Sequence, residues 1–189
     1  MELVLIRHGL PVRADDTSDP PLSETGLEQA RRVAARLAEE GVDAVFASTM
    51  RRAVQTAEPF AAQAGHAIHE RPGIVEFDRD KGSYVPMEEL KREDYEAWKA
   101  FVAGGHGADI ESFQKDVVGT LEEIIAAHSG KTVAVFCHGG VINVWTAHIL
   151  GMTPRLFFEP AYASVHRFLC ARSGQRNVVS LNDVGHLRN

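Results

Sequence analysis

Cysteine is scarce in this sequence: Cys137 and Cys170 are the two present among 189 residues. They stand far apart, each inside an apolar stretch, so they provide neither a disulfide framework nor the spacing of a zinc site. Sparse cysteines without a framework are typical of a reducing compartment, and we therefore expect the protein to be cytoplasmic.

Long apolar runs and an excess of positive charge are also lacking. The first apolar run, residues 3–6, ends at Arg7, and Glu2 stands where a signal peptide carries positive charge. We therefore expect neither a secretory segment nor a membrane span. The net charge is −6, so a nucleic-acid partner or an anionic membrane surface is not expected either. An anionic substrate stays compatible with this charge, because arginines can cluster locally on an acidic protein.

Short apolar runs alternate with segments of helical periodicity, without repeats or a linker long enough to separate domains. Such runs predict strands buried on both faces. We expect strands over residues 2–7, 43–47, 67–70 and 132–137, then a hairpin over 162–171 and 177–181. We expect helices from within 23–26 to Gly41, over 50–64, 87–102 and 110–128, and from the glycines at 139–140 to Leu150. The alternation predicts one α/β domain, residues 1–189, built as a three-layer α/β/α sandwich around a mostly parallel sheet.

The first predicted helix has two candidate N-terminal caps. Thr25 and Glu28 have the spacing of a capping box, and Ser23 is a rival cap. Helical periodicity gives this helix one inward face. The residues expected on that face are Leu27, Ala30, Val33, Ala34, Leu37 and Ala38.

The middle of the chain, residues 71–107, is charged and rich in loops. We expect residues 77–107 to form a lid insertion that contains the helix over 87–102. The candidate substrate contacts in this lid are Lys81, Tyr84, Lys91 and Arg92.

Polar residues directly follow three of the predicted strands. The first strand ends in Arg7-His8-Gly9, the second runs into residues 48–52 with Arg51 and Arg52, and the fourth ends in His138-Gly139-Gly140. Parallel strands bring their carboxyl ends to one edge of the sheet, where ligands bind in such folds. Arginine matches tetrahedral oxyanions, and helix N-termini favour negative charge. We therefore predict a phosphate site.

Each of these segments has an ordinary explanation when taken alone. A single histidine after a strand is more often structural, two arginines are compatible with a solvated helix start, and a His-Gly-Gly segment is compatible with a turn. Their coincidence at three strand ends favours a site. Gly9 and Gly140 would let the backbone approach a ligand closely. A histidine nucleophile would need one neutral, unprotonated ring nitrogen.

Taken together, these segments resemble the histidine phosphatase superfamily, which includes cofactor-dependent phosphoglycerate mutases and many small phosphatases. The family's order is kept over most of the chain. The matching blocks are Arg7-His8-Gly9, residues 19–30 with Asp19-Pro20-Pro21-Leu22-Ser23, residues 48–57, Glu76 and residues 138–142. The resemblance implies a phosphoglycerate mutase-like fold.

The resemblance also implies the catalytic and phosphate-binding residues. His8 would be the nucleophile that becomes phosphohistidine. Arg7, Gly9, Arg52 and His138 would bind the phosphate, with His138 also counted as catalytic. Arg52 rather than Arg51 matches the family's arginine, because it stands immediately before an alanine.

Glu76 matches the family's acid, which protonates the leaving oxygen and later activates water. Asp78 and Asp80 stand close by in the sequence and are alternatives for this role. One carboxyl group can act as acid and base in two half-reactions. No metal and no cofactor are expected, and we interpret six other histidines as structural or surface residues: His66, His69, His106, His128, His148 and His166.

The sequence departs from the mutases after Gly9. Leu10-Pro11-Val12-Arg13 replaces a polar stretch with a Ser and an Asn that handle phosphoglycerate, and the Gly-x-Trp-Glu-Gly stretch is absent. We therefore predict a metal-independent phosphomonoesterase for a small phosphorylated substrate. A phosphoglycerate mutase and a non-catalytic phospho-ligand binding module are the alternatives. An oligomer also stays open, through residues 145–158 or the terminal hairpin.

Overall fold

The computed structural model describes residues 1–80, 82–101, 103 and 109–188. Six strands form one sheet in the order β3-β2-β4-β1-β5-β6. Their bounds are Glu2–Arg7 (β1), Ala44–Ser48 (β2), Ile68–Arg71 (β3), Thr132–Cys137 (β4), Val165–Cys170 (β5) and Arg176–Asp183 (β6). β1, β2, β3 and β4 pair in parallel, whereas β5 runs antiparallel to β1 and to β6. The predicted, mostly parallel sheet is confirmed.

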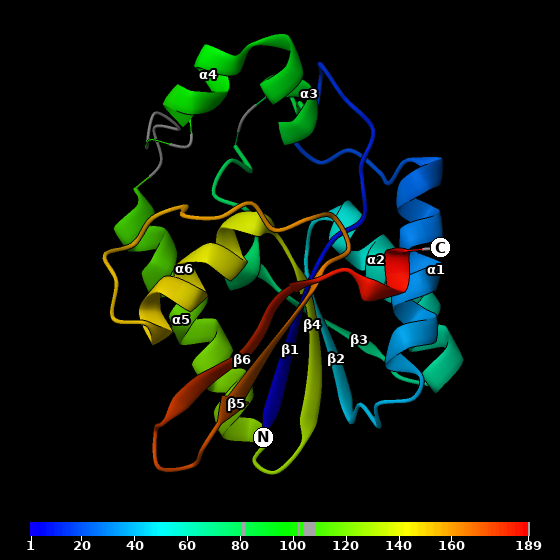
Figure 1. Ribbon diagram of the computed structural model, residues 1–189. Helices are drawn as coiled ribbons and strands as arrows, with labels where there is room; N and C mark the ends of the chain where they lie inside the picture. Colours follow the sequence, from blue (N-terminus) through cyan, green and yellow to red (C-terminus); the bar gives the residue numbers. More distant parts are fainter. Residues whose placement is uncertain (81, 102, 104–108, 189) are drawn as a thin grey trace.

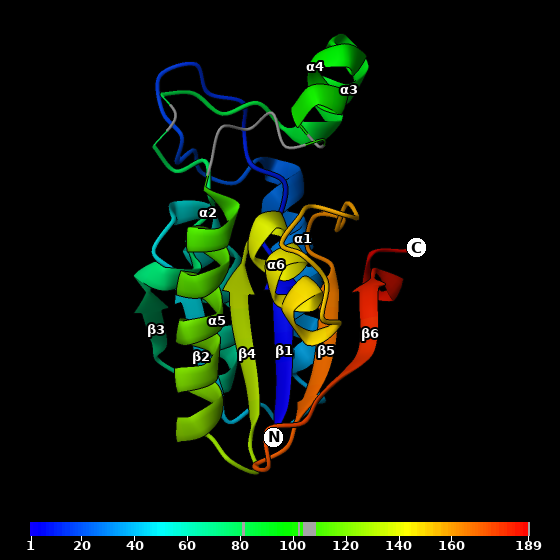
Figure 2. The same ribbon diagram turned by 90° about the vertical axis from the view of Figure 1, so that its left-hand side faces the viewer.

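Helices cover both faces of this sheet. The described helices are α1 (Glu24–Leu37), α2 (Arg51–Ala64), η1 (Pro72–Ile74), α3 (Met87–Glu93), α4 (Tyr95–Ala100), α5 (Ile110–Ala127), α6 (Gly139–Ile149) and η3 (Gly185–Leu187). Figures 1 and 2 show α1 and α2 on one face of the sheet and α5 and α6 on the other. The prediction of a three-layer α/β/α sandwich is therefore confirmed.

β1 lies inside the sheet and is buried on both faces. Leu3 and Leu5 pack in the cluster that includes α5 and α6, and Val4 and Ile6 pack in the cluster that includes α1 and α2. Successive side chains of a strand point to opposite faces, so every side chain of a strand between two helical layers is buried and apolar residues are favoured at each position. This burial explains why the first apolar run is unbroken up to Arg7.

The inward face of α1 differs from the predicted one. Ser23 is the cap, because its side chain accepts a hydrogen bond from the backbone N–H of Gly26. Leu27 is 40% exposed and Ala38 is an exposed C-terminal cap, so both were wrongly assigned to the core. The helix instead buries Gly26 at its first turn, and its buried stripe runs through Gly26, Ala30, Val33, Ala34 and Leu37.

The single helix predicted over residues 87–102 is also wrong. The segment forms two short helices, α3 and α4, which meet at Asp94. Asp94 leaves helical geometry at φ −144°, and its carboxylate accepts a hydrogen bond from the N–H of Ala97 at 2.9 Å. An aspartate that caps a new helix competes with continuation of the old one. The expected C-terminal end of the helix, Val102, lies outside the described residues.

The helices α3 and α4 lie above the carboxyl ends of the parallel strands (Figure 1). The segment that leads to them is attached to the loop after β1, because Ala14 and Tyr84 exchange backbone hydrogen bonds of 3.0 and 2.7 Å. The described part of residues 77–107 therefore lies over this edge of the sheet, and its role as a lid stays a prediction. Its residues 81, 102 and 104–107 lie outside the described part.

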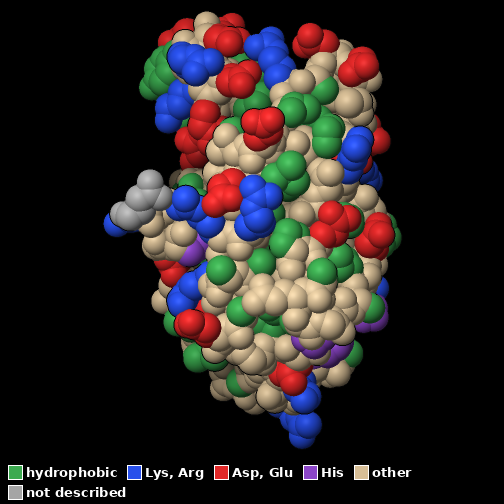
Figure 3. All heavy atoms as spheres, turned by 90° about the vertical axis from the view of Figure 1, so that its right-hand side faces the viewer, with side chains coloured by type: hydrophobic (Ala, Val, Ile, Leu, Met, Phe, Trp, Pro, Cys, Tyr) green, Lys and Arg blue, Asp and Glu red, His purple; other side chains and the backbone are tan. Residues whose placement is uncertain are grey.

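The outer surface of α1 is charged. Glu28 pairs with Arg31 at 2.9 Å and with Arg32 at 3.1 Å. Figure 3 shows acidic and basic side chains interspersed on the face of the molecule that carries this helix. Among the described residues, no helix combines the length and the apolar character needed to cross a membrane.

The loop after β1 packs directly on the backbone of α1. A Cβ added at Gly26 would lie 2.1 Å from the carbonyl oxygen of Leu10, and one added at Gly9 would lie 2.6 Å from that of Gly26. These contacts are too close for any side chain. The pair of glycines therefore sets the distance between α1 and the strand end that carries His8.

We expect Gly26→Ala to lower the free energy of unfolding by about 1–3 kcal/mol, because the added methyl group meets backbone and forces a shift. Gly119→Ala is the matched control, since a Cβ at this position on α5 would meet nothing within 4 Å. It should stabilise the protein by about 0.5–1 kcal/mol. Urea titration measures both, and equal effects of the two substitutions would contradict the packing argument.

Candidate active site

The carboxyl ends of β1, β2 and β4 lie at one edge of the sheet, below α3 and α4. β1 and β4 pair in register up to Arg7 and Cys137, and β2 leads into α2, which carries Arg52. A cavity of about 280 Å³ opens there and is lined by Arg7, His8, Arg52 and Glu76 among others. Its size is that of a small-molecule site. Four residues predicted from the sequence are thus brought together.

His8 has both ring nitrogens engaged. Nδ1 lies 2.8 Å from the carbonyl oxygen of Gly9, and Nε2 lies 3.2 Å from Nε of Arg52. A carbonyl only accepts and a guanidinium only donates, so Nδ1 carries the proton and Nε2 offers its lone pair. Burial lowers the pKa of His8 well below its usual value, and the nearby charge of Arg52 lowers it further. His8 is therefore held as a neutral imidazole.

Two buried arginines flank this imidazole. Arg52 is fully buried, and its Nη1 donates to the carbonyl oxygen of Ser18 at 3.0 Å and lies 3.6 Å from the carboxylate of Asp19. Arg7 donates to the carbonyl oxygen of Pro160 and lies over the ring of Tyr162, 3.8 Å from its centroid. Such contacts hold the guanidinium planes in place.

His138 lies next to His8 but is not among the residues that line the cavity. It is fully buried, its ring centroid is 5.1 Å from that of His8, and its Nε2 lies 2.8 Å from Oγ of Ser48. Burial lowers its pKa well below the usual value, and Arg52 and Arg7 add to this effect. Gly9 likewise lies beside the cavity rather than in its wall.

Three buried nitrogen atoms around His8 have no hydrogen-bond partner among the described residues. They are Nε of Arg7, Nη2 of Arg52 and Nδ1 of His138. Buried polar groups are nearly always paired, so three such atoms in one cluster call for an explanation. The arginine nitrogens are donors, and an oxyanion bound beside His8 would supply acceptors for them.

Glu76 is partly buried and is held at the N-terminus of α6. Its carboxylate accepts hydrogen bonds from the backbone N–H of Gly140 at 3.0 Å and of Phe77 at 3.1 Å. A Cβ on Gly140 would lie 2.1 Å from Oε1 of Glu76, so only glycine lets the carboxyl group come this close. Burial, followed by the charge of Asp78, raises the pKa of Glu76 to about 7. Near neutral pH this group can both give and take a proton.

The two alternative acids lie differently. Asp78 lines the cavity, whereas Asp80 does not, and its side chain is 93% exposed beside Arg79. The geometry therefore keeps Glu76 and Asp78 as candidates for the proton donor, and Glu76 is the one anchored by two backbone hydrogen bonds.

Two of the expected lid contacts line the cavity and one does not. Tyr84 and Lys91 are lining residues, and the hydroxyl of Tyr84 lies 3.3 Å from that of Tyr162. Arg92 lies outside the lining. Lys81 and His106 fall outside the described residues.

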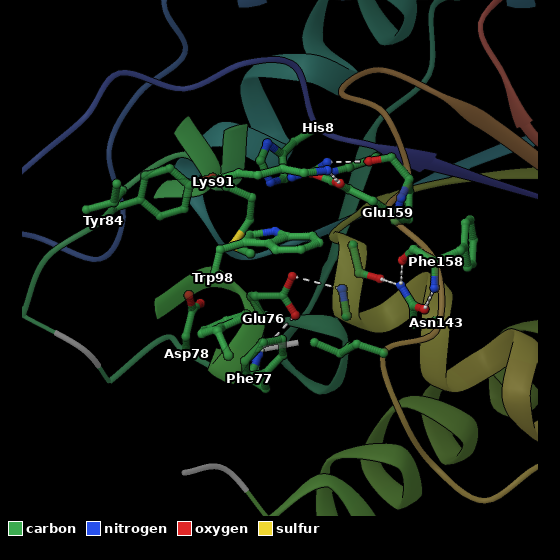
Figure 4. A pocket seen from close by; sticks show the side chains of 18 of the residues that line it. His8, Glu76, Phe77, Asp78, Tyr84, Lys91, Trp98, Asn143, Phe158 and Glu159 are labelled. Atoms are coloured by element: carbon green, nitrogen blue, oxygen red, sulfur yellow. Dashed lines mark hydrogen bonds and ion pairs between the residues drawn. The ribbon is translucent and has the colours of Figure 1, made fainter. Parts of the chain in front are cut away.

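Sequence reasoning missed several residues of the cavity. Asn143 is a polar residue inside the apolar helix α6, and this contrast was a usable signal. It is 2% exposed and bonds to the backbone of residues 157–158. Trp98, Phe158 and Glu159 come from surface segments whose sequence gives no such signal. Figure 4 shows these residues around the cavity.

The residues of the described segments form no group of three or more His, Cys, Asp or Glu side chains that would hold a metal ion. The prediction of metal independence remains to be tested by assay.

Comparison with known proteins places this arrangement in a family. The model of the histidine phosphatase superfamily (branch 1) matches residues 3–184. Phosphoserine phosphatase 1 of Hydrogenobacter thermophilus is 28% identical over 199 residues, which cover 99% of this chain and 94% of that protein. Phosphoglycerate mutase-like protein 4 of Arabidopsis thaliana is 30% identical over 157 residues, or 75% and 68% of the two chains.

Solved structures agree. The crystal structure of phosphoserine phosphatase from Entamoeba histolytica in complex with 3-phosphoglyceric acid has a TM-score of 0.77 and 25% identity, and the match covers 99% of each chain.

The raised pKa of Glu76 predicts a pH-dependent stability. The pKa of Glu76 is about 7 in the folded protein and about 4.5 in an ordinary glutamate, so the folded protein binds this proton more tightly. The resulting stabilisation is fully present below about pH 4.5 and is lost as the pH rises through about 7. Across this window, wild type should lose on the order of 1–3 kcal/mol relative to Glu76→Gln, which has no proton to release. Urea titrations of both proteins between these pH values measure the difference. If the free energies of unfolding of wild type and Glu76→Gln differed by the same amount at every pH, the raised pKa of Glu76 would be contradicted.

Proposed function

This chain belongs to the histidine phosphatase superfamily, and we propose that it hydrolyses small phosphate monoesters through a phosphohistidine on His8. It is a phosphoric monoester hydrolase by its family and by its similarity to a phosphoserine phosphatase. The observation that carries the mechanism is the neutral His8, whose Nε2 lone pair faces a buried arginine. We further propose that residues 1–189 act as one domain with residues 77–107 as its lid.

In the first half-reaction, Nε2 of His8 attacks phosphorus while the bond to the ester oxygen breaks. The electron pair of that bond goes to the ester oxygen, which takes the proton of Glu76. The hydrogen bond from Arg52 passes from Nε2 to a phosphate oxygen, because the lone pair is now used for the new bond. Arg7 and Arg52 neutralise the equatorial oxygens, which is the main demand of phosphoryl transfer.

In the second half-reaction, the Glu76 carboxylate takes a proton from water. The water oxygen attacks phosphorus, the P–N bond breaks, and its electron pair returns to Nε2 of His8. Inorganic phosphate leaves and the starting protonation states are restored. A carboxyl group with a pKa of about 7 suits both steps, because neither form is scarce near neutral pH.

Hydrolysis is favoured over transfer between positions of one substrate by the residues after Gly9. Leu10 and Pro11 do not line the cavity. The N–H of Leu10 is bound to Oε1 of Gln29 at 2.8 Å, and Pro11 forms a bridge to Leu22. This segment therefore packs on the protein and gives a bisphosphate no polar contact that would hold it for a second transfer.

Arg52 and Arg51 provide a matched pair of substitutions. Arg52→Ala should lower kcat/KM by about a hundredfold or more, because it removes a preorganised donor. Arg51 is exposed and does not line the cavity, so Arg51→Ala should change kcat/KM little. Steady-state assays with 4-nitrophenyl phosphate and added chelator measure both.

His8→Ala should abolish turnover. It should also abolish the acid-labile labelling of the protein by the phosphoryl group of the substrate, because no phosphohistidine can form. An active His8→Ala protein would refute the mechanism.

Glu76→Gln should distinguish leaving groups. Release of nitrophenolate needs little protonation, whereas release of an alkoxide needs a proton in the transition state. We therefore expect the substitution to slow alkyl phosphates much more than 4-nitrophenyl phosphate in the phosphorylation step, and to slow dephosphorylation for both. Burst kinetics resolve the two steps. An unchanged leaving-group dependence would move the acid role to Asp78.

A further inference from the structure

The half of the cavity beyond His8 has a predominantly apolar wall. The residues that form it come from the segment after β3, from the lid and from the loop before β5: Phe77, Met87, Trp98, Phe101, Leu156 and Phe158. Phe77 is packed against Phe101 and Phe113, with ring centroids 5.7 Å apart in each case. Phe113 of α5, which does not line the cavity, therefore packs behind this wall. A group bound here would exchange water for aromatic and aliphatic carbon.

Among the residues that the structure describes, one lysine lines this half of the cavity, and it is already paired with a carboxylate. Nζ of Lys91 lies 3.4 Å from Oε2 of Glu159 and 4.3 Å from the ring centroid of Trp98. In the view of Figure 4, the indole of Trp98 lies between Lys91 and Glu76. The ammonium group is thus held between a carboxylate and a π face.

The position of Glu159 is fixed by hydrogen bonds between Asn143 and the backbone of the two residues before Glu159. Oδ1 of Asn143 accepts hydrogen bonds from the N–H of Phe157 at 2.8 Å and of Phe158 at 3.2 Å. Nδ2 of Asn143 donates to the carbonyl oxygens of Gly139 at 2.9 Å and of Phe158 at 3.0 Å. The buried amide therefore ties the start of α6 to the segment that ends in Glu159.

We propose that the leaving group taken by this cavity is an uncharged, largely apolar or aromatic alcohol, and that Glu159 excludes alcohols that carry a carboxylate. This inference rests on the proposed phosphatase function and names its substrate class. A substrate carboxylate that bound Lys91 would lie beside Glu159, and like charges at such a distance repel each other. Asp78 also lines the cavity and adds a second carboxylate to this otherwise apolar wall.

The inference separates this chain from its named relatives. Phosphoserine, after which two of these relatives are named, and 3-phosphoglycerate, which is bound to one of them in its crystal structure, both carry a carboxylate two carbons from the ester oxygen. If this chain shared their ligands, it would prefer the substrate with the carboxylate. The alcohol favoured by this wall has the bulk of a phenyl ring or a short aryl-alkyl chain, which packs against aromatic side chains without needing a charged partner.

The test uses two substrates with phenol leaving groups of similar basicity: 4-ethylphenyl phosphate and 4-(carboxymethyl)phenyl phosphate. They share the ring and the scissile bond, and they differ in the charge at the far end. We expect kcat/KM of wild type to be about tenfold or more higher for the ethyl compound, the range that a mismatched group in a pocket commonly produces.

Glu159→Gln leaves Lys91 without its carboxylate partner and should raise kcat/KM for the carboxymethyl compound, while kcat/KM for the ethyl compound changes little. The ratio of kcat/KM for the ethyl compound to that for the carboxymethyl compound should then fall to about threefold or less. Glu96→Gln is the matched control. Glu96 also pairs with a lysine, Lys99, at 3.1 Å, but it lies on the outside of α4 and does not line the cavity. The Glu96→Gln protein should show the same ratio of kcat/KM for the two compounds as wild type.

The outcomes separate the two claims. Hydrolysis of both compounds without a preference, a preference for the carboxylate, or a ratio unaffected by Glu159→Gln would overturn the inference and leave the phosphatase function intact. Failure to hydrolyse either compound, or equal hydrolysis by His8→Ala, would overturn the proposed function and the inference with it.

Discussion

The hydrogen bond from Arg52 to Nε2 of His8 is the interaction on which the site depends. It brings a guanidinium against an imidazole where both side chains are buried, so a second positive charge is strongly disfavoured. The carbonyl oxygen of Gly9 fixes the remaining proton on Nδ1. The outcome is a nucleophile that stays neutral because it is buried and because two arginines lie beside it. The same cations that lower the pKa of His8 are the groups that would neutralise a phosphate, so binding and activation share one cause.

The fold supplies this arrangement through backbone contacts rather than through flexible side chains. β1 lies beside β4 in parallel register, so His8 and His138 leave the sheet at the same level. The close approach at Gly26 sets α1 against the loop after His8, and Gly140 admits the carboxyl group of Glu76. A methyl group would meet the backbone of Leu10 at Gly26 and the carboxyl group of Glu76 at Gly140. Rigid strand ends thus carry the reacting groups, and the lid and the loop before β5 shape the half that receives the alcohol.

Much of the site could be predicted from the sequence because its residues follow buried strands. An unbroken apolar run that ends in Arg7 and His8 predicts a buried strand with a binding site at its end, and parallel pairing then brings the strand ends together. The structure adds what periodicity cannot reveal. Leu27 is exposed because α1 turns the neighbouring Gly26 toward the loop after β1. Asp94 divides a helix because its carboxylate caps the second half. Lys91 and Glu159 meet only in the folded chain, since 68 residues separate them. Such contacts depend on loop geometry, for which composition and spacing carry no information.

The protonation state of His8 is the most direct test of this account. Nitrogen-15 NMR of histidine-labelled protein, with His8→Gln to assign the signal, distinguishes the two neutral tautomers and the imidazolium. We expect a proton on Nδ1 and a bare Nε2 at about pH 6.5, where an ordinary histidine is half protonated, because burial and Arg52 lower the pKa of His8. An imidazolium at about pH 6, or a proton on Nε2 in the neutral form, would contradict the claim that the site holds His8 ready for attack on phosphorus.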